Sequence, residues 1–188
     1  MPHSLTSPDL LQTLADRVDE LEKRLASTPS SDRLCLMVYS GELDRLMAAF
    51  TMATGAAASG MSVSMFFTFW GTPALKSTGG SAAKKPLMDR LMGLMLPGGL
   101  DSRKLSKLDF LGVGRRMMQH RMKKMGIASL SELVTLAGQL GVQLTVCEMS
   151  MSLMGISEED LLEYPHLTIA GAATFVDDAS RAATTLFI

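Results

Sequence analysis

The sequence predicts an α/β protein, a three-layer α/β/α fold with a five-stranded parallel sheet, preceded by a coiled-coil-like helix. Two observations lead to this fold class. Short apolar runs typical of buried strands alternate with helical segments along the chain. The connections carry no hairpin signal, so successive strands are expected to run parallel. The 188 residues suffice for one domain with a sizeable core.

A helix is expected near the N-terminus because Ser7 can cap it, Pro8 suits its first turn and Asp9 complements its dipole. Apolar residues then recur at alternating spacings of three and four, which is a heptad pattern. They are Leu11, Leu14, Val18, Leu21 and Leu25. Charged residues flank this narrow stripe, so we predict a homo-oligomer that associates through this arm. Residues 1–31 are expected to be the arm and its linker, and residues 32–188 the α/β domain.

A strand, a helix and a second strand are expected at the start of the domain. Residues 33–39 form an apolar strand whose interior holds Cys35, expected to be buried and inert, and a helix follows over residues 42–58. Residues 61–70 are expected to be a second buried strand. A membrane span within the uncharged stretch at 46–75 is the alternative, which we do not favour because the pattern changes in its middle.

An insertion is expected between the second and third strands, over residues 72–127. It should contain a loop at 72–85, an apolar helix at 86–96, a charged connector at 101–107 and a basic helix at 115–125. The basic helix is interpreted as a solvated helix with a methionine-packed side, or as a docking surface for an acidic partner or an anion. No aromatic residues that could stack on bases lie nearby, and the net charge is −1, so we expect no nucleic acid partner.

The last part of the chain should hold three more strands. A capping box at Ser129 begins a helix to residue 140. The elements that follow are a strand at 142–146, a helix from Cys147 to Gly155, a short helix from residue 157, a strand at 167–170, a helix at 171–181 and a strand at 184–188.

Cys147 is expected where the third strand ends and a helix begins. Ligands bind at the carboxyl ends of the strands in open α/β sheets. Unpaired N–H groups at a helix start favour an anion, so we predict an exposed thiolate with a lowered pKa. Glu148 would raise that pKa if its carboxylate pointed at the sulfur. Ser150 and Met151 are expected to shape the cysteine pocket, unless they serve helix packing alone.

The sequence gives little support for a metal site, a nucleotide-binding motif or a serine nucleophile. The two cysteines and three histidines show no metal spacing, so we expect no metal and no other cofactor. Dinucleotide, P-loop and serine-nucleophile motifs are absent. His166 is expected at the wrong end of its strand to pair with Cys147. Two cysteines form no disulfide framework and the N-terminus does not look like a signal peptide, so we predict a cytoplasmic location.

Three segments together resemble the DsrE/DsrF-like sulfur-relay family. They are LCLMVYSG at 34–41, FFTFWG at 66–71 and CEMSMSLMG at 147–155, whose Ser-Met repeat is the most specific part. The resemblance covers residues 33–188 and is strongest for the branch with a long methionine-rich insertion after the second strand. The N-terminal arm lies outside it.

The resemblance implies a five-stranded parallel α/β/α fold, oligomerisation, and a sulfur carrier or sulfurtransferase function. The family's carrier cysteine corresponds to Cys147. It would accept sulfane sulfur as a persulfide from a rhodanese-like or TusA-like protein and pass it to a partner protein. The chemistry of the residues agrees, because thiol exchange requires a nucleophile and access rather than an acid–base pair.

Two other functions stay open at this stage. One is a noncatalytic oligomeric module that binds a small anion or a nucleotide at the carboxyl edge of the sheet, near Ser40, Gly41, Trp70 and Gly71. The other is a thiol peroxidase, which lacks a clear resolving cysteine because Cys35 is expected inside a strand.

Overall fold

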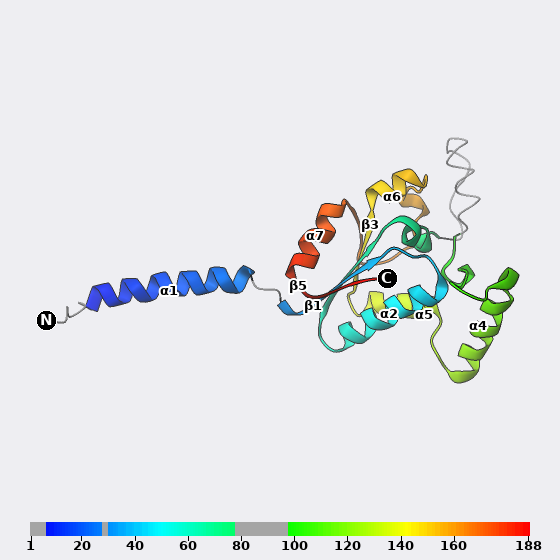
Figure 1. Ribbon diagram of the computed structural model, residues 1–188, viewed down its shortest axis with the longest axis horizontal. Helices are drawn as coiled ribbons and strands as arrows, with labels where there is room; N and C mark the ends of the chain where they lie inside the picture. The colour runs from blue at the N-terminus through cyan, green and yellow to red at the C-terminus, as the bar shows by residue number, and fades with distance from the viewer. Residues whose placement is uncertain (1–6, 28–29, 78–97) are drawn as a thin grey trace.

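The computed structural model describes residues 7–27, 30–77 and 98–188 (Figure 1). In these residues five strands form one parallel sheet in the order β4-β3-β2-β1-β5. The strands are β1 (Ser30–Val38), β2 (Ser62–Phe67), β3 (Gln143–Cys147), β4 (Leu167–Ala170) and β5 (Ala182–Phe187). The predicted fold class, a parallel five-stranded sheet flanked by helices, is confirmed.

Helices cover both faces of the sheet (Figure 1). α2 (Leu43–Ala58) and α5 (Leu130–Gln139) lie on one face and α7 (Ala172–Arg181) on the other. The chain crosses the sheet in one direction from β1 to β4, and α7 then leads back to β5 beside β1. Because parallel crossovers are right-handed, this reversal places α7 on the opposite face. Phe175 of α7 packs there against Phe66 of β2, with ring centroids 5.6 Å apart.

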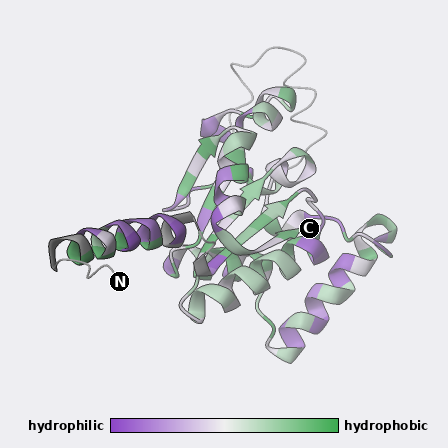
Figure 2. Ribbon diagram, turned by 60° about the vertical axis from the view of Figure 1, so that its left-hand side comes forward, coloured by the Kyte–Doolittle hydropathy of each residue, from purple (hydrophilic) through white to green (hydrophobic). Residues whose placement is uncertain are grey.

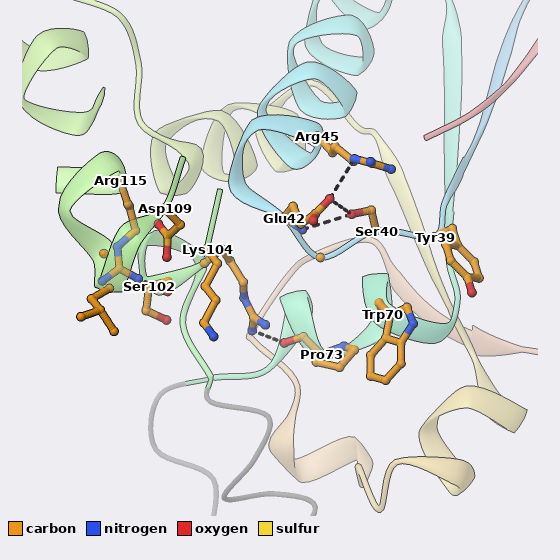
Figure 3. Close-up of a pocket in the computed structure, with 14 residues that line it drawn as sticks. Tyr39, Ser40, Glu42, Arg45, Trp70, Pro73, Ser102, Lys104, Asp109 and Arg115 are labelled. Carbon is orange, nitrogen blue, oxygen red and sulfur yellow. Dashed lines mark hydrogen bonds and ion pairs between the residues drawn. The ribbon is translucent and has the colours of Figure 1, made fainter. Parts of the chain in front are cut away.

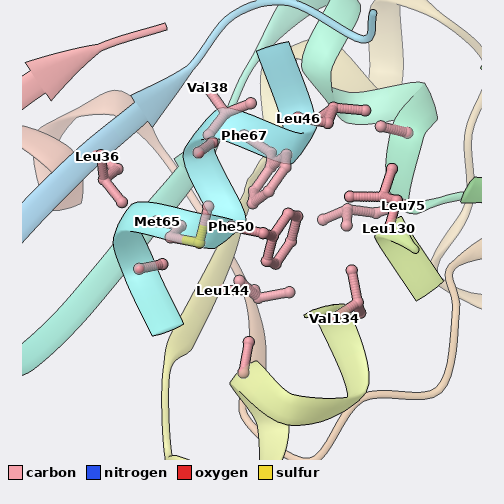
Figure 4. Close-up of a cluster of buried hydrophobic side chains, with 14 of the residues drawn as sticks. Leu36, Val38, Leu46, Phe50, Met65, Phe67, Leu75, Leu130, Val134 and Leu144 are labelled. Atoms are coloured by element: carbon pink, nitrogen blue, oxygen red, sulfur yellow. The ribbon is translucent and has the colours of Figure 1, made fainter. Parts of the chain in front are cut away.

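The hydrophobic core lies between the sheet and the layer formed by α2 and α5 (Figure 4). Met65 and Leu144 point from the strands toward Phe50 of α2 and Val134 of α5. The rings of Phe50 and Phe67 are fully buried, with centroids 6.0 Å apart. Replacing either ring by alanine is expected to cost about 3–5 kcal/mol of stability.

The second strand ends earlier than predicted. β2 stops at Phe67, and the 3-10 helix η1 (Phe69–Leu75) follows it. The chain leaves the sheet because Phe69 adopts a left-handed conformation (φ 43°) and its N–H donates to Ser150 Oγ instead of to a neighbouring strand. The last four residues of η1, expected to lie in a loop, are buried.

α1 (Ser7–Ser27) confirms the predicted N-terminal helix and projects from the α/β body (Figure 1). Its apolar stripe alternates with hydrophilic residues (Figure 2). Leu11, Leu14, Val18 and Leu21 are between 50% and 66% exposed. The predicted stripe is therefore uncovered in a single chain, while the assembly that would cover it stays a prediction.

The remaining helices of the described residues are α4 (Val113–Met125), α6 (Glu148–Leu153), η3 (Leu100–Ser102), η4 (Phe110–Gly112) and η5 (Glu158–Asp160). α4 confirms the predicted basic helix, but its expected methionine-packed side is wrong, because Met117 is 71% and Met125 62% exposed. The capping box at Ser129 is confirmed. The predicted helix at 86–96 lies outside the described residues. Among the described residues, no helix combines the length and apolar character needed to cross a bilayer.

Candidate functional site

Cys147 lies at the junction that the sequence predicts, as the last residue of β3 and the N-cap of α6. Its expected exposure is wrong, because only 2% of the residue is exposed. The physical reason is that α6 packs against η1 at this edge of the sheet. A cysteine at the end of a strand would otherwise face solvent.

Hydrogen-bond donors surround the Cys147 sulfur. The hydroxyl and backbone N–H of Ser150, the hydroxyl of Thr68 and the backbone N–H of Met149 each act to lower its pKa. Burial raises the pKa of Cys147, but these donors outweigh it and hold the pKa below the ordinary value of 9.0. The predicted lowering of the pKa is confirmed, and it arises from side chains as well as from the helix start.

Ser150 joins the cysteine to the segment that follows β2. Its fully buried Oγ lies 3.0 Å from Thr68 Oγ1 and accepts the N–H of Phe69 at 2.9 Å. Met151 is a member of the hydrophobic core, and Glu148 is exposed. Sequence reasoning missed Thr68, although a hydroxyl directly after a buried strand at this sheet edge is a usable signal.

Cys35 lies in contrasting surroundings in the middle of β1. It is 1% exposed, and burial raises the pKa of its thiol above 9.0. The prediction that Cys35 is buried is confirmed.

A cavity of about 820 Å³ lies at the carboxyl end of β1 (Figure 3). Ser40, Gly41 and Trp70, which the sequence predicts as pocket residues, line it together with residues of η1 and of the segment 102–115. Cys147 does not line this cavity. The structure thus divides the predicted site residues between two places, the Cys147 surroundings and this cavity.

Gly71 plays a different part, since it is buried where the turns after β1 and β2 cross. A Cβ atom on Gly71 would lie 2.2 Å from the carbonyl oxygen of Val38, and one on Gly41 would lie 2.3 Å from that of Trp70. Only glycine allows backbones to approach this closely. This glycine crossing, formed by Gly41 and Gly71, fixes η1 against the end of β1.

η1 separates the Cys147 surroundings from the cavity. The backbone N–H of Phe69, at its start, bonds to Ser150 on the cysteine side. Trp70 and Pro73, which follow, line the cavity. The two places are therefore neighbours that share one short segment of backbone.

The described residues contain no candidate metal site, and His166 lies at the other end of the sheet from Cys147. No three His, Cys, Asp or Glu side chains of the described ranges are grouped to hold a metal ion. The backbone carbonyl of His166 accepts the N–H of Leu144, three residues before Cys147 along β3. His166 thus precedes β4 at the far end from Cys147, as predicted.

The chain matches a family model, and it is similar to several known proteins. The model of the DsrE/DsrF/DrsH-like family matches residues 30–187. The chain is 37% identical over 161 residues to the uncharacterized protein YrkE of Bacillus subtilis (strain 168), covering 86% of this chain and 99% of YrkE. It is 30% identical over 168 residues to the sulfur carrier protein DsrE2 of Allochromatium vinosum, covering 83% of this chain and 98% of DsrE2. The crystal structure of YchN from E. coli is similar with a TM-score of 0.45 and 12% identity, covering 83% of this chain and 99% of YchN.

Proposed function

Because the chain belongs to the DsrE/DsrF/DrsH-like family, we propose that it is a sulfur carrier that holds sulfane sulfur as a persulfide on Cys147. The observation that carries this proposal is the set of donors around the sulfur, which lowers the pKa of the thiol. The thiolate is the nucleophile of thiol exchange. The similarity to DsrE2, a sulfur carrier protein, supports the same class of function.

In the proposed transfer, the Cys147 thiolate attacks the terminal sulfur of a donor persulfide. The S–S bond of the donor breaks, the donor leaves as a thiolate, and Cys147 becomes the persulfide. An acceptor thiolate then attacks the outer sulfur of Cys147 in the same way. The sulfane sulfur keeps its oxidation level throughout, so no oxidant or reductant is required.

Access to Cys147 requires a local opening, because the residue is 2% exposed. α6 is the natural element to move, since it has only six residues and presents Met149 and Leu153 to solvent at 56% and 63% exposure. We place the docking of the rhodanese-like or TusA-like donor and acceptor proteins on this helix. Charged substitution of Leu153 should then slow loading from a protein donor but not from a small polysulfide.

The decisive experiment is mass spectrometry of the intact protein after incubation with a sulfane donor. We expect one added sulfur atom on the wild type and on Cys35→Ala, and none on Cys147→Ser. A dithiol reductant should remove the added sulfur. An unmodified Cys147, or equal loading of Cys147→Ser, would contradict the proposal.

We also propose that the protein self-associates through the exposed stripe of α1. Leu14→Asp places a charge in the stripe and is expected to lower the molar mass measured by light scattering. Gln12→Asp adds the same charge outside the stripe and should leave the assembly intact. Equal masses for the two variants would show that the arm does not hold the subunits together.

A further inference from the structure

The cavity at the end of β1 contains a buried cation that has no ion-pair partner among the described residues. Arg103 lines the cavity and is 9% exposed. Its Nη2 donates to the carbonyl oxygen of Pro73, while its Nε has no hydrogen-bond partner among the described residues. Within the described parts of the chain Arg103 forms no ion pair. Burying a charge in this way is unfavourable, so an orphaned donor of this kind calls for an explanation.

The other charged residues around the cavity leave an excess of positive charge. Two carboxylates line it, against four cationic side chains: Glu42 pairs with Arg45 at 2.8 Å, and Asp109 accepts the N–H of Leu105 at 3.4 Å and keeps its charge. Lys104 and Arg115 lie on the same side of the cavity (Figure 3) and, in the described ranges, form no ion pair. Apart from the Glu42–Arg45 pair, three cations and one carboxylate, Asp109, line the cavity, and the described residues form no ion pair with these cations.

The segment that carries Arg103 and Lys104 is held in place by hydrogen bonds to α2. Leu43 N–H donates to the carbonyl oxygen of Lys104 at 2.8 Å, and Ser106 N–H donates to Asp44 Oδ1 at 2.9 Å. Burial lowers the pKa of Arg103 to about 10, so the guanidinium stays charged at neutral pH. A cationic wall that is fixed before a ligand arrives loses little entropy on binding.

The opposite wall is aromatic. Trp70, which is 55% exposed, and Tyr39 lie there on the same side (Figure 3). The volume of about 820 Å³ is in the range of small-molecule sites, which run to roughly 300–1,000 Å³. A site with cations on one wall and aromatic rings on the other suits a ligand with an anionic group and room for a planar one.

We propose that this cavity binds a small molecule through a tetrahedral oxyanion group, with Arg103 as the central ligand and Lys104 and Arg115 at the rim. Guanidinium and ammonium groups are the usual protein ligands of phosphate and sulfate oxygens. The oxyanion is either a free inorganic ion or the phosphate of a nucleotide whose base lies on Trp70. The site is on the far side of η1 from Cys147 and does not depend on sulfur transfer.

The protein carries its own reporter for this test, because Trp70 is its single tryptophan and lines the cavity. The probes are inorganic phosphate, sulfate and ADP, each titrated at constant ionic strength and followed by tryptophan fluorescence and calorimetry. At least one of them is expected to give a saturable change. A response to all three assigns the site to the oxyanion alone, and a response to ADP only assigns it to a nucleotide.

Variants separate a specific site from general attraction to positive charge. Arg103→Gln should weaken binding at least tenfold, and Lys104→Gln, which changes an exposed side chain, should weaken it severalfold. Arg121→Gln removes the same charge from α4 outside the cavity and should leave the affinity unchanged. Cys147→Ser should also bind as the wild type does, whether or not the sulfur proposal holds.

Two results would overturn the proposal. One is that none of the three probes gives a saturable response. The other is equal affinity of Lys104→Gln and Arg121→Gln together with unchanged affinity of Arg103→Gln. If circular dichroism shows that Arg103→Gln does not fold, the comparison of Lys104→Gln with Arg121→Gln decides by itself.

Discussion

The two cysteines of this protein occupy equally buried places and are tuned in opposite directions. Cys35 in the middle of β1 is 1% exposed, and Cys147 at the end of β3 is 2% exposed. The pKa of Cys35 is raised by burial, whereas at Cys147 hydrogen-bond donors outweigh burial and lower the pKa. The residues' exposure therefore does not by itself separate a candidate nucleophile from a packing residue, whereas the number of donors does: four groups lower the pKa at Cys147 and the Ser64 hydroxyl alone does so by hydrogen bonding at Cys35.

An alkylation experiment tests the difference between the two cysteines most directly, and we expect the largest effect there. At neutral pH, Cys147 should react with iodoacetamide at least roughly tenfold faster than Cys35, because it holds more of the reactive thiolate. Rates are measured by mass spectrometry in Cys35→Ala and Cys147→Ser, which each leave one thiol. Equal rates in the two variants would mean that burial alone governs both sulfurs.

Removing the Ser150 hydroxyl should bring the pKa values of the two thiols closer together. Ser150→Ala is expected to raise the pKa of Cys147, and it leaves the N–H of Phe69 without its acceptor. An unsatisfied buried N–H costs about 1–3 kcal/mol of stability. The readouts are the midpoint of the pH–alkylation curve and denaturant unfolding. Ser152→Ala, on the exposed side of α6, is the matched control, and an unshifted midpoint in Ser150→Ala would contradict the assignment.

The dependence of stability on pH should have opposite signs for the two thiols. Between the lowered pKa of folded Cys147 and 9.0, the unfolded chain binds more protons than the folded one, so stability rises with pH in this window. The gain is lost as the pH falls through the folded pKa. For Cys35, whose folded pKa is raised, stability instead falls as the pH rises above 9.0. The free energy of unfolding, measured over this pH range, reports the contribution of Cys35 in Cys147→Ser and that of Cys147 in Cys35→Ala. Equal slopes of this free energy against pH in the two variants would contradict the predicted opposite signs.

The smallest effect is expected from Thr68→Val, which keeps the shape of the side chain and removes a lesser donor. The pKa of Cys147 should rise less than in Ser150→Ala, and stability should fall by about 1 kcal/mol, as for one lost hydrogen bond. The same alkylation and unfolding measurements apply. A shift larger than that of Ser150→Ala would reverse the proposed ranking of the donors.

Local sequence patterns predicted most of the architecture. β4 was placed at its true bounds, residues 167–170, and Cys147 at its true junction, because apolar runs and helix starts are read from neighbouring residues. The end of β2 was wrong because the partner of the Phe69 N–H is Ser150, which lies 81 positions away in the chain.

The features that sequence reasoning missed also depend on contacts between segments that lie far apart in the chain. Cys147 was expected to be exposed, but it is covered where α6 meets η1, two elements far apart in sequence. The sequence places Arg103 in a charged connector, whereas in the structure it is buried and donates a hydrogen bond to Pro73 of η1. A charged residue in a polar stretch gives no local sign that a distant segment will enclose it.

The glycine crossing restricts which sequences this scaffold can tolerate. Gly41 and Gly71 each face a carbonyl oxygen so closely that even a methyl group would force the two turns apart. Gly55 in α2 meets no such obstacle, since a Cβ there would contact nothing within 4 Å. A library that randomises all three positions should therefore return glycine at 41 and 71 among its folded members and accept alanine freely at 55.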